Sequence, residues 1–273
     1  MTTDPNTPDH SGSSTPADHL RIVLVCTQHP GNIGSAARAI KTMGLSRLVL
    51  VGPERPTSAE AAALAAGADD VLAGALRFET LAEAVADCRL VLGCTARSRR
   101  VPLDELHPRD AAARAVGDAA TGAEVALVFG RERTGLTNDE LQLCHAAVNI
   151  PANPEYSSLN LAAAVQVLAY ELRLSILERN AAAAGMGAAG NGAAVDHRRD
   201  DPPASHAELE GFFTQLAGTL DAIDFHKGRA PESAMRKLRR LFLRADLDAR
   251  EVRLLRGILA DAERMAMLAG QRR

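Results

Sequence analysis

From about residue 20 to residue 178 the chain alternates short apolar runs with amphipathic stretches. The apolar runs are rich in β-branched residues and are nearly continuous, which is typical of parallel strands covered by helices on both faces. The expected strands are Arg21–Thr27, Arg47–Val51, Arg89–Thr95, Val125–Gly130 and Ala147–Ile150, and the expected helices lie at about 32–43, 58–66, 79–87, 108–117, from 138, and 158–178. The sequence therefore predicts an α/β domain over 20–178, with a parallel sheet flanked by helices.

A different pattern follows this domain. Residues 179–205 mix alanine and glycine without a large apolar period and end in charge and proline, which predicts a linker. Over 206–273 apolar residues such as Leu209, Phe212 and Leu216 recur three to four positions apart, which predicts a small helical extension. Three helices in roughly 60 residues build only a weak core. We therefore expect the extension to pack on another surface.

The first 19 residues contain neither a basic start nor an apolar run, so we expect a disordered tail rather than a signal peptide or membrane anchor. No stretch approaches the ~18 uninterrupted apolar residues of a membrane span. The four cysteines lack the paired spacing of a zinc site and the density of a secreted disulfide scaffold. We expect a cytoplasmic protein with no membrane partner and no bound metal.

Composition limits the kinds of nucleic-acid surface that the chain can offer. The 31 basic and 34 acidic residues give a net charge of −3, which excludes a uniformly basic protein. Six phenylalanines, two tyrosines and no tryptophan argue against stacked aromatic platforms. The charge is uneven, because residues 226–244 carry seven cations and one anion. This segment is either a solvated helix face or a surface for phosphates.

The segment 29–38, HPGNIGSAAR, joins the first predicted strand to the first predicted helix. Proline and glycine predict a sharp turn, and Asn32 can cap the helix. Gly34 and Arg38 are four residues apart and share a helix face, so Gly34 leaves space beside the Arg38 guanidinium. This pattern suits a cation directed at a bulky anion, although an ordinary surface arginine is the alternative. This turn lacks the glycine patterns of dinucleotide folds and phosphate loops.

Two later segments have the character of ligand loops. Residues 130–136, GRERTGL, follow a predicted strand, and Thr137 with Glu140 forms a capping box for the next helix. Ligands of open α/β sheets bind at such strand ends, where glycine permits close approach. Residues 149–160, NIPANPEYSSLN, enter the long helix, which Ser157 or Ser158 can cap. Together the loops predict a polar ligand site that needs no metal. The alternatives are that residues 130–136 simply connect a strand to a helix and that residues 149–160 simply cap the long helix.

The three segments, extended to HPGNIGSAARAIKTMGLSRLVLV, ALVFGRERTGLTNDEL and NIPANPEYSSLNLAAAVQVLAYE, resemble in order and spacing the motifs of the SpoU-like branch of SPOUT RNA methyltransferases. The resemblance covers about residues 20–178, and the segment RKLRRLFLRADLDAREVRLLRGILADAE resembles a C-terminal helical extension found in that family. It implies a parallel sheet with a C-terminal trefoil knot, a homodimer, S-adenosylmethionine as cofactor and a tRNA substrate. The amino-acid sequences of these segments are most similar to those of enzymes that methylate the ribose 2′-hydroxyl of the pyrimidine at position 32 of the anticodon loop.

Matched by position, the resemblance also implies site residues. Catalysis would fall to Arg38, with Ser158 and Asn160 orienting the site. The implied cofactor contacts are Cys94, Thr95, Ala96, Gly130, Ile150, Ser157, Ser158 and Leu159. Cys94 stands where relatives tend to carry a small hydroxyl residue, a change that a backbone contact would tolerate. The expected RNA contacts are Arg38, Arg97, Arg99, Arg131, Arg236, Lys237, Arg239 and Arg240.

Three alternatives stay open at this point. The enzyme could act on another tRNA position or on rRNA. A non-catalytic RNA-binding protein would have the basic helix without a cofactor pocket. A nucleotide-binding oxidoreductase would use an acidic residue after the second strand, where Glu54 is available, but it would also need the missing glycine fingerprint.

Overall fold

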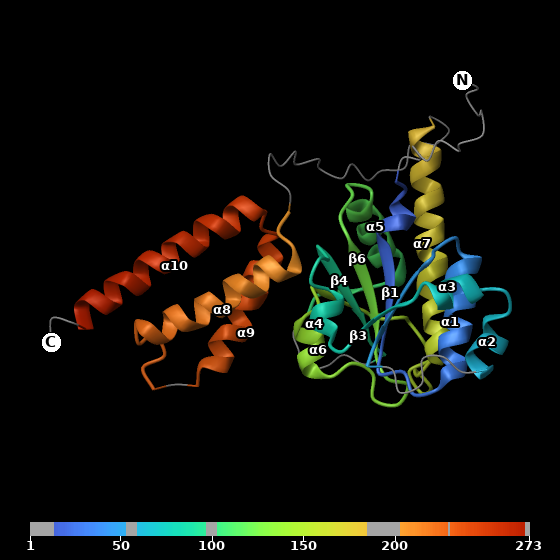
Figure 1. Cartoon of the computed structure of the whole chain (residues 1–273), viewed down its shortest axis with the longest axis horizontal. Helices are drawn as coiled ribbons and strands as arrows, with labels where there is room; N and C mark the ends of the chain where they lie inside the picture. The colour runs from blue at the N-terminus through green and yellow to red at the C-terminus, as the bar shows by residue number, and fades with distance from the viewer. Residues whose placement is uncertain (1–13, 53–58, 97–102, 185–202, 229, 271–273) are drawn as a thin grey trace, which may run out of the picture.

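A computed structural model of the chain describes residues 14–52, 59–96, 103–184, 203–228 and 230–270. Its centre is a seven-stranded sheet in the order β3-β2-β1-β6-β4-β7-β5, with every pair of neighbours parallel (Figure 1). The strands are β1 (Leu20–Val25), β2 (Arg47–Val51), β3 (Leu76–Phe78), β4 (Leu90–Cys94), β5 (Glu105–Leu106), β6 (Val125–Phe129) and β7 (Ala146–Val148). All five predicted strands are confirmed, and the short β3 and β5 extend the sheet at its two edges.

Helices cover both faces of this sheet, as the continuous apolar strands predicted. They are α1 (Pro30–Thr42), α2 (Ala59–Ala65), α3 (Asp69–Ala73), α4 (Leu81–Ala84), α5 (Pro108–Ala119), α6 (Asn138–Gln142) and α7 (Leu161–Ala183). One face packs on α1, α5 and α7 through residues such as Ile22, Leu127 and Leu168. The other face packs on α4 and α6 through residues such as Val23 and Val128. The parallel three-layer α/β architecture is thereby confirmed.

Several element ends differ from the prediction for local reasons. The first strand ends at Val25 rather than Thr27, because Cys26 turns the backbone into the left-handed region with φ 48°. Within the tail expected to be disordered, Pro16–His19 form a 3₁₀ helix that leads directly into β1. The long helix α7 ends at Ala183, five residues into the predicted linker. None of the helices within the described ranges combines the length and apolar character that crossing a bilayer requires.

The C-terminal extension forms three helices, α8 (His206–Ala222), α9 (Pro231–Ala245) and α10 (Ala249–Gly270), beside the sheet domain, which we call the body (Figure 1). Its small core contains Phe212 and Phe242 in an edge-to-face arrangement with ring centres 4.8 Å apart. As the weak core predicted, the extension packs on the body. The backbone N–H groups of His206 and Ala207 donate to carbonyls of the α4–β4 connection, each at 2.9 Å.

Candidate active site

A pocket of about 520 Å³ lies at the carboxyl ends of β4, β6 and β7. The loops that follow these strands meet there, at the lower edge of the sheet in Figure 1, and the loop after β7 leads directly into α7. All the residues expected to contact a cofactor line it, namely Cys94, Thr95, Ala96, Gly130, Ile150, Ser157, Ser158 and Leu159. The fold therefore brings together residues from three separate segments, at the place where open α/β sheets hold their ligands.

The loop after β6 is shaped by close backbone contact. A Cβ atom on Gly130 would lie 2.2 Å from backbone atoms of Gly135 and Leu136, so only glycine fits there. Gly135 has φ 66°, and a bridge between Arg131 and Gly135 closes the loop on itself. The predicted capping box of Thr137 and Glu140 then starts α6. The glycines thus form a compact loop that walls the pocket.

A chain of hydrogen bonds joins the three segments that the sequence singled out. Asn160 Nδ2 donates to Asn32 Oδ1 at 2.9 Å, and Asn32 Nδ2 donates to Glu132 Oε1 at 3.0 Å. Glu132 also accepts the backbone N–H groups of Gln28 and His29. Burial opposes the charge on Glu132, but these donors hold the pKa of its carboxyl below the usual range. Sequence reasoning missed Glu132, although its position between two loop arginines was a signal.

Two predicted caps are wrong in detail. His29 occupies the N-cap position of α1 without a side-chain capping hydrogen bond, and Pro30 is the first helical residue, so Asn32 lies inside the first turn and makes the contacts above. Asn160, rather than Ser157 or Ser158, caps α7 by accepting the N–H groups of Ala162 and Ala163. The serine hydroxyls are therefore left to the pocket wall.

The role predicted for Gly34 is also wrong. A Cβ atom at Gly34 would lie 2.0 Å from the carbonyl oxygen of Ala61, so this glycine lets α1 and α2 pack closely rather than making room beside Arg38. Arg38 is exposed on α1 and does not line the pocket of its own chain. It makes no ion pair within the part of the chain that the structure describes.

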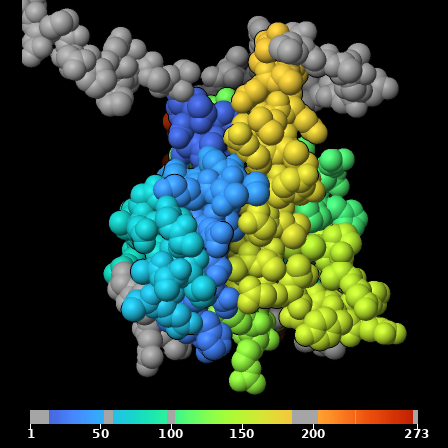
Figure 2. All heavy atoms as spheres, turned by 90° about the vertical axis from the view of Figure 1, so that its right-hand side faces the viewer, coloured from blue at the N-terminus to red at the C-terminus, as the bar shows by residue number. Residues whose placement is uncertain are grey.

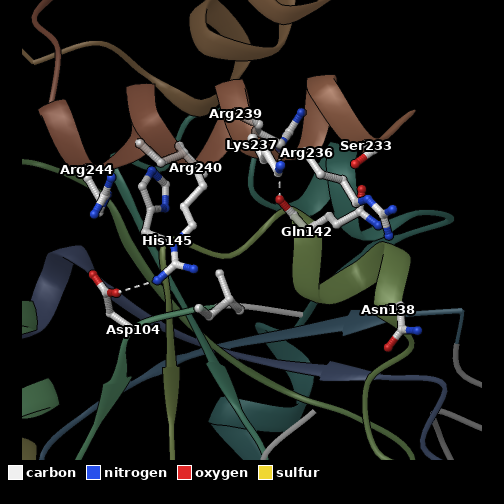
Figure 3. A pocket seen from close by; sticks show the side chains of 12 residues that line it. Asp104, Asn138, Gln142, His145, Ser233, Arg236, Lys237, Arg239, Arg240 and Arg244 are labelled. Carbon is white, nitrogen blue, oxygen red and sulfur yellow. Dashed lines mark hydrogen bonds and ion pairs between the residues drawn. The ribbon is translucent and has the colours of Figure 1, made fainter. Parts of the chain in front are cut away.

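Apart from Arg38, the expected RNA contacts fall into three groups. Arg97 and Arg99 lie outside the described residues. Arg131 lines the pocket, but its guanidinium is held by Glu140 Oε1 and Oε2 at 3.0 Å each and by Cys26 Sγ at 3.1 Å, partners that the sequence did not predict. The others are on α9, where Arg236 and Lys237 are exposed while Arg239 and Arg240 contact the body (Figure 3). Within the described ranges, no cluster of three or more His, Cys, Asp or Glu side chains could hold a metal ion.

The chain matches the models of two known protein families. Residues 19–170 match the model of the SpoU rRNA Methylase family. The chain therefore belongs to the SpoU methylase family. Residues 207–271 match the model described as the C-terminal domain of the tRNA methyltransferase TrmJ.

Individual relatives agree with both matches. The chain is 51% identical over 245 residues to the tRNA (cytidine/uridine-2′-O-)-methyltransferase TrmJ of Salmonella typhimurium, covering 90% of this chain and 96% of that protein. The TrmJ of Yersinia enterocolitica is 50% identical over 90% of this chain and 92% of its own length. Among solved structures, TrmJ from Z. mobilis ZM4 superposes with a TM-score of 0.73 at 35% identity, covering 89% of this chain and 98% of that one. These relatives share the body and the extension.

Proposed function

We propose that the protein transfers a methyl group from S-adenosylmethionine to the ribose 2′-hydroxyl of a tRNA nucleotide. The observation that carries this proposal is the pocket at the ends of β4, β6 and β7, in a chain 51% identical to a tRNA (cytidine/uridine-2′-O-)-methyltransferase. The pyrimidine at position 32 of the anticodon loop is the proposed target. The proposal includes a trefoil knot in the C-terminal part of the body and a cytoplasmic location.

The pocket suits S-adenosylmethionine by its chemistry. Its apolar floor, which includes Phe129, Val148 and Leu161, fits an adenosine, while hydroxyl and backbone groups at the rim fit the polar amino-acid part. The residues that would hold the cofactor are Cys94, Thr95, Ala96, Gly130, Ile150, Ser157, Ser158 and Leu159. When bound, it supplies an electrophilic methyl group on a sulfonium.

The residues of this chain position the acceptor rather than remove its proton by strong base. Arginine is effectively always protonated, so we assign Arg38 to binding the phosphate next to the target ribose and to stabilising the developing alkoxide. Ser158, at the pocket wall, and Asn160, held between α7 and Asn32, orient the site. Holding two reactants in line supplies much of the acceleration in such a reaction.

The proposed homodimer is supported by one face of the body. Figure 2 shows α1 and α7 side by side on this face, and the two helices are in contact. Two large apolar side chains of α7, Tyr170 and Leu177, are 49% and 45% exposed in the single chain. A second copy packed on α1 and α7 would cover such side chains, and α1 also carries the exposed Arg38.

Mass spectrometry of tRNA tests the function directly. Unmodified tRNA is incubated with the protein and S-adenosylmethionine, digested with nuclease and analysed for mass and position of the product. We expect a gain of one methyl group on the ribose of nucleotide 32. A matched tRNA with a 2′-deoxynucleotide at position 32 should gain none. Methylation of a base, or equal methylation of the deoxy substrate, would contradict the proposal.

A further inference from the structure

Tyr156 is the most exposed large apolar side chain among the residues that the structure describes. Its exposed fraction is 82%, although it directly precedes Ser157 and Ser158 in the wall of the candidate cofactor pocket. Single exposed apolar side chains are common on protein surfaces, so the case for a ligand depends on what surrounds this ring.

The backbone around Tyr156 is fixed by a turn. The N–H of Tyr156 donates to the Asn153 carbonyl at 2.9 Å, and the N–H of Glu155 donates to Asn153 Oδ1 at 3.0 Å. Pro151 and Pro154 restrict φ on either side of Asn153. The ring therefore projects from a preorganised backbone, which lowers the entropy that a contact with a ligand costs.

Arg133 is an exposed cation in another wall of the same pocket, formed by the loop after β6. Its neighbours in the loop are already engaged. Arg131 is held by both carboxylate oxygens of Glu140, and Glu132 accepts Asn32 Nδ2 and two backbone N–H groups. Arg133 makes no ion pair with any residue in the described ranges. Its charge is therefore available to an anion at the pocket.

The substrate of the proposed reaction carries a partner for each of these groups. The bases of a single-stranded RNA loop can be splayed out and stacked on aromatic side chains. Stacking on a ring tolerates any base, because every base has a π-face. A guanidinium binds phosphate oxygens through charge-assisted hydrogen bonds. One ring suffices when one nucleotide enters the site, which agrees with a chain that has only 8 aromatic residues in its composition of six Phe and two Tyr.

We propose that Tyr156 and Arg133 form an acceptor subsite at the rim of the cofactor pocket. Tyr156 stacks on the base of the target nucleotide, and Arg133 binds the flanking phosphate that Arg38 does not. The inference rests on the proposed function and adds to it the residues that receive the nucleotide. Because stacking does not read the hydrogen-bonding edge of a base, the subsite accepts cytidine and uridine alike.

The first test separates the ring from the rest of the side chain in the full-length protein. Tyr156→Leu should lower kcat/KM for tRNA by roughly tenfold or more, the contribution of one stacked base, whereas Tyr156→Phe should stay within about twofold of the wild type. Phe225→Leu makes the same change at an exposed ring of the extension and should have no effect. Calorimetry should show unchanged affinity for S-adenosylmethionine in all three variants.

Two results would overturn stacking by Tyr156. One is a Tyr156→Phe enzyme as impaired as Tyr156→Leu, which would assign the effect to the hydroxyl. The other is an altered oligomeric state of Tyr156→Leu in size-exclusion chromatography, which would assign the ring to a contact between copies.

The salt dependence of tRNA binding tests Arg133. Filter binding over about 50 to 200 mM salt should show the slope of log affinity against log salt reduced by about 0.7 in Arg133→Ala, because one contact to a single-stranded phosphate is lost. Tyr156→Leu should bind more weakly with an unchanged slope. Arg77→Ala, at an exposed position of β3, is the matched control. A wild-type slope in Arg133→Ala would remove this residue from the subsite.

Photo-cross-linking locates the base directly. A tRNA with 5-iodouridine at the target position is irradiated with the wild type and S-adenosylhomocysteine, and the cross-linked peptide is identified by mass spectrometry. We expect the cross-link at Tyr156, and none when the 5-iodouridine lies in the anticodon stem. If the wild type methylates tRNA but the cross-link maps elsewhere, the subsite is overturned and the proposed function stands. If the wild type methylates no tRNA, the proposed function falls, and the subsite with it.

Discussion

The body and the extension bury their apolar residues in different ways. In the body, strands β1 and β6 are buried at every position, and small alanine-rich helices pack closely on them. In the extension, α9 has no buried residue, and the core depends on aromatic rings such as Phe212. A continuous sheet core is self-sufficient, whereas a core this small needs the surface beside it.

This difference separates two tasks. The body can hold the pocket residues in register, since they lie at the ends of buried strands or in the loops that follow these strands, one of which leads into the long helix α7. The extension adds a charged surface, and hydrogen bonds such as that from Arg239 to the Gln142 carbonyl fix it to the body. Under the proposed function, the body would carry the chemistry and the extension would contribute to RNA binding, and the following predictions test this division.

The largest effect is expected at Arg38. Arg38→Ala should lower the methylation rate by about 10³-fold, because it removes a preorganised charge from the acceptor side. Affinity for S-adenosylmethionine, measured by calorimetry, should stay nearly intact, since Arg38 does not line the pocket of its own chain. Arg77→Ala, at an exposed position of β3, is the control. A fully active Arg38→Ala enzyme would remove catalysis from this residue.

Next in size is the aromatic core of the extension. Phe212 is 1% exposed, and Phe212→Ala should cost about 3–5 kcal/mol, enough to unfold so small a unit. Hydrogen exchange should then show α8–α10 exchanging fast while the sheet stays protected, with cofactor affinity kept. Loss of protection throughout the sheet would show that body and extension form one cooperative unit.

A smaller effect compares two glycines of the body. Gly34→Ala should destabilise the fold by about 1–3 kcal/mol, because its Cβ would meet the Ala61 carbonyl at 2.0 Å. Gly117→Ala in α5 has open space around it and should stabilise by about 0.5–1 kcal/mol. Chemical denaturation measures both. Equal effects of the two changes would contradict the tight α1–α2 contact.

The last effect is a pH dependence at the junction between the extension and the body, spread over more than two pH units. Burial, and then Arg239, lowers the pKa of His206 to about 4 from an ordinary 6.5. Between these two pH values the histidine of the unfolded chain binds a proton and that of the folded chain does not. The free energy of unfolding therefore decreases as the pH is lowered, by up to about 1.4 kcal/mol for each pH unit. Hydrogen exchange of α8 should accelerate from pH 6.5 downward, before carboxylates such as Glu124 titrate. His206→Leu should reduce this dependence, and the remainder should come from the neighbouring His145, whose pKa burial lowers to about 3.

Much of the fold was predictable because long buried strands leave a strong apolar signal. Arg47–Val51 begins and ends where the pattern predicted, whereas β5, with two residues, is too short to leave one. The cap of α7 was misplaced because Ser157, Ser158 and Asn160 are all good capping residues, and only the path of the loop selects among them.

The motifs predicted which residues line the candidate site, but they did not predict which side chains form ion pairs there. The residues expected around the cofactor line one pocket, because the motif order places them at neighbouring strand ends. The partners of Arg131 and Arg239 could not be predicted, since Glu140 and Glu210 reach them only through the fold. A cation's sequence neighbours do not reveal whether it is paired.

The hydrogen-bond chain Asn160–Asn32–Glu132 has a consequence for how this sequence can diverge. Each amide in it fixes the orientation of the next, so a replacement at Asn32 disturbs two other motifs at once. Substitutions at these three positions should therefore be strongly epistatic. A chimera that takes one motif from a distant homologue should lose more activity than one that inherits all three as a block.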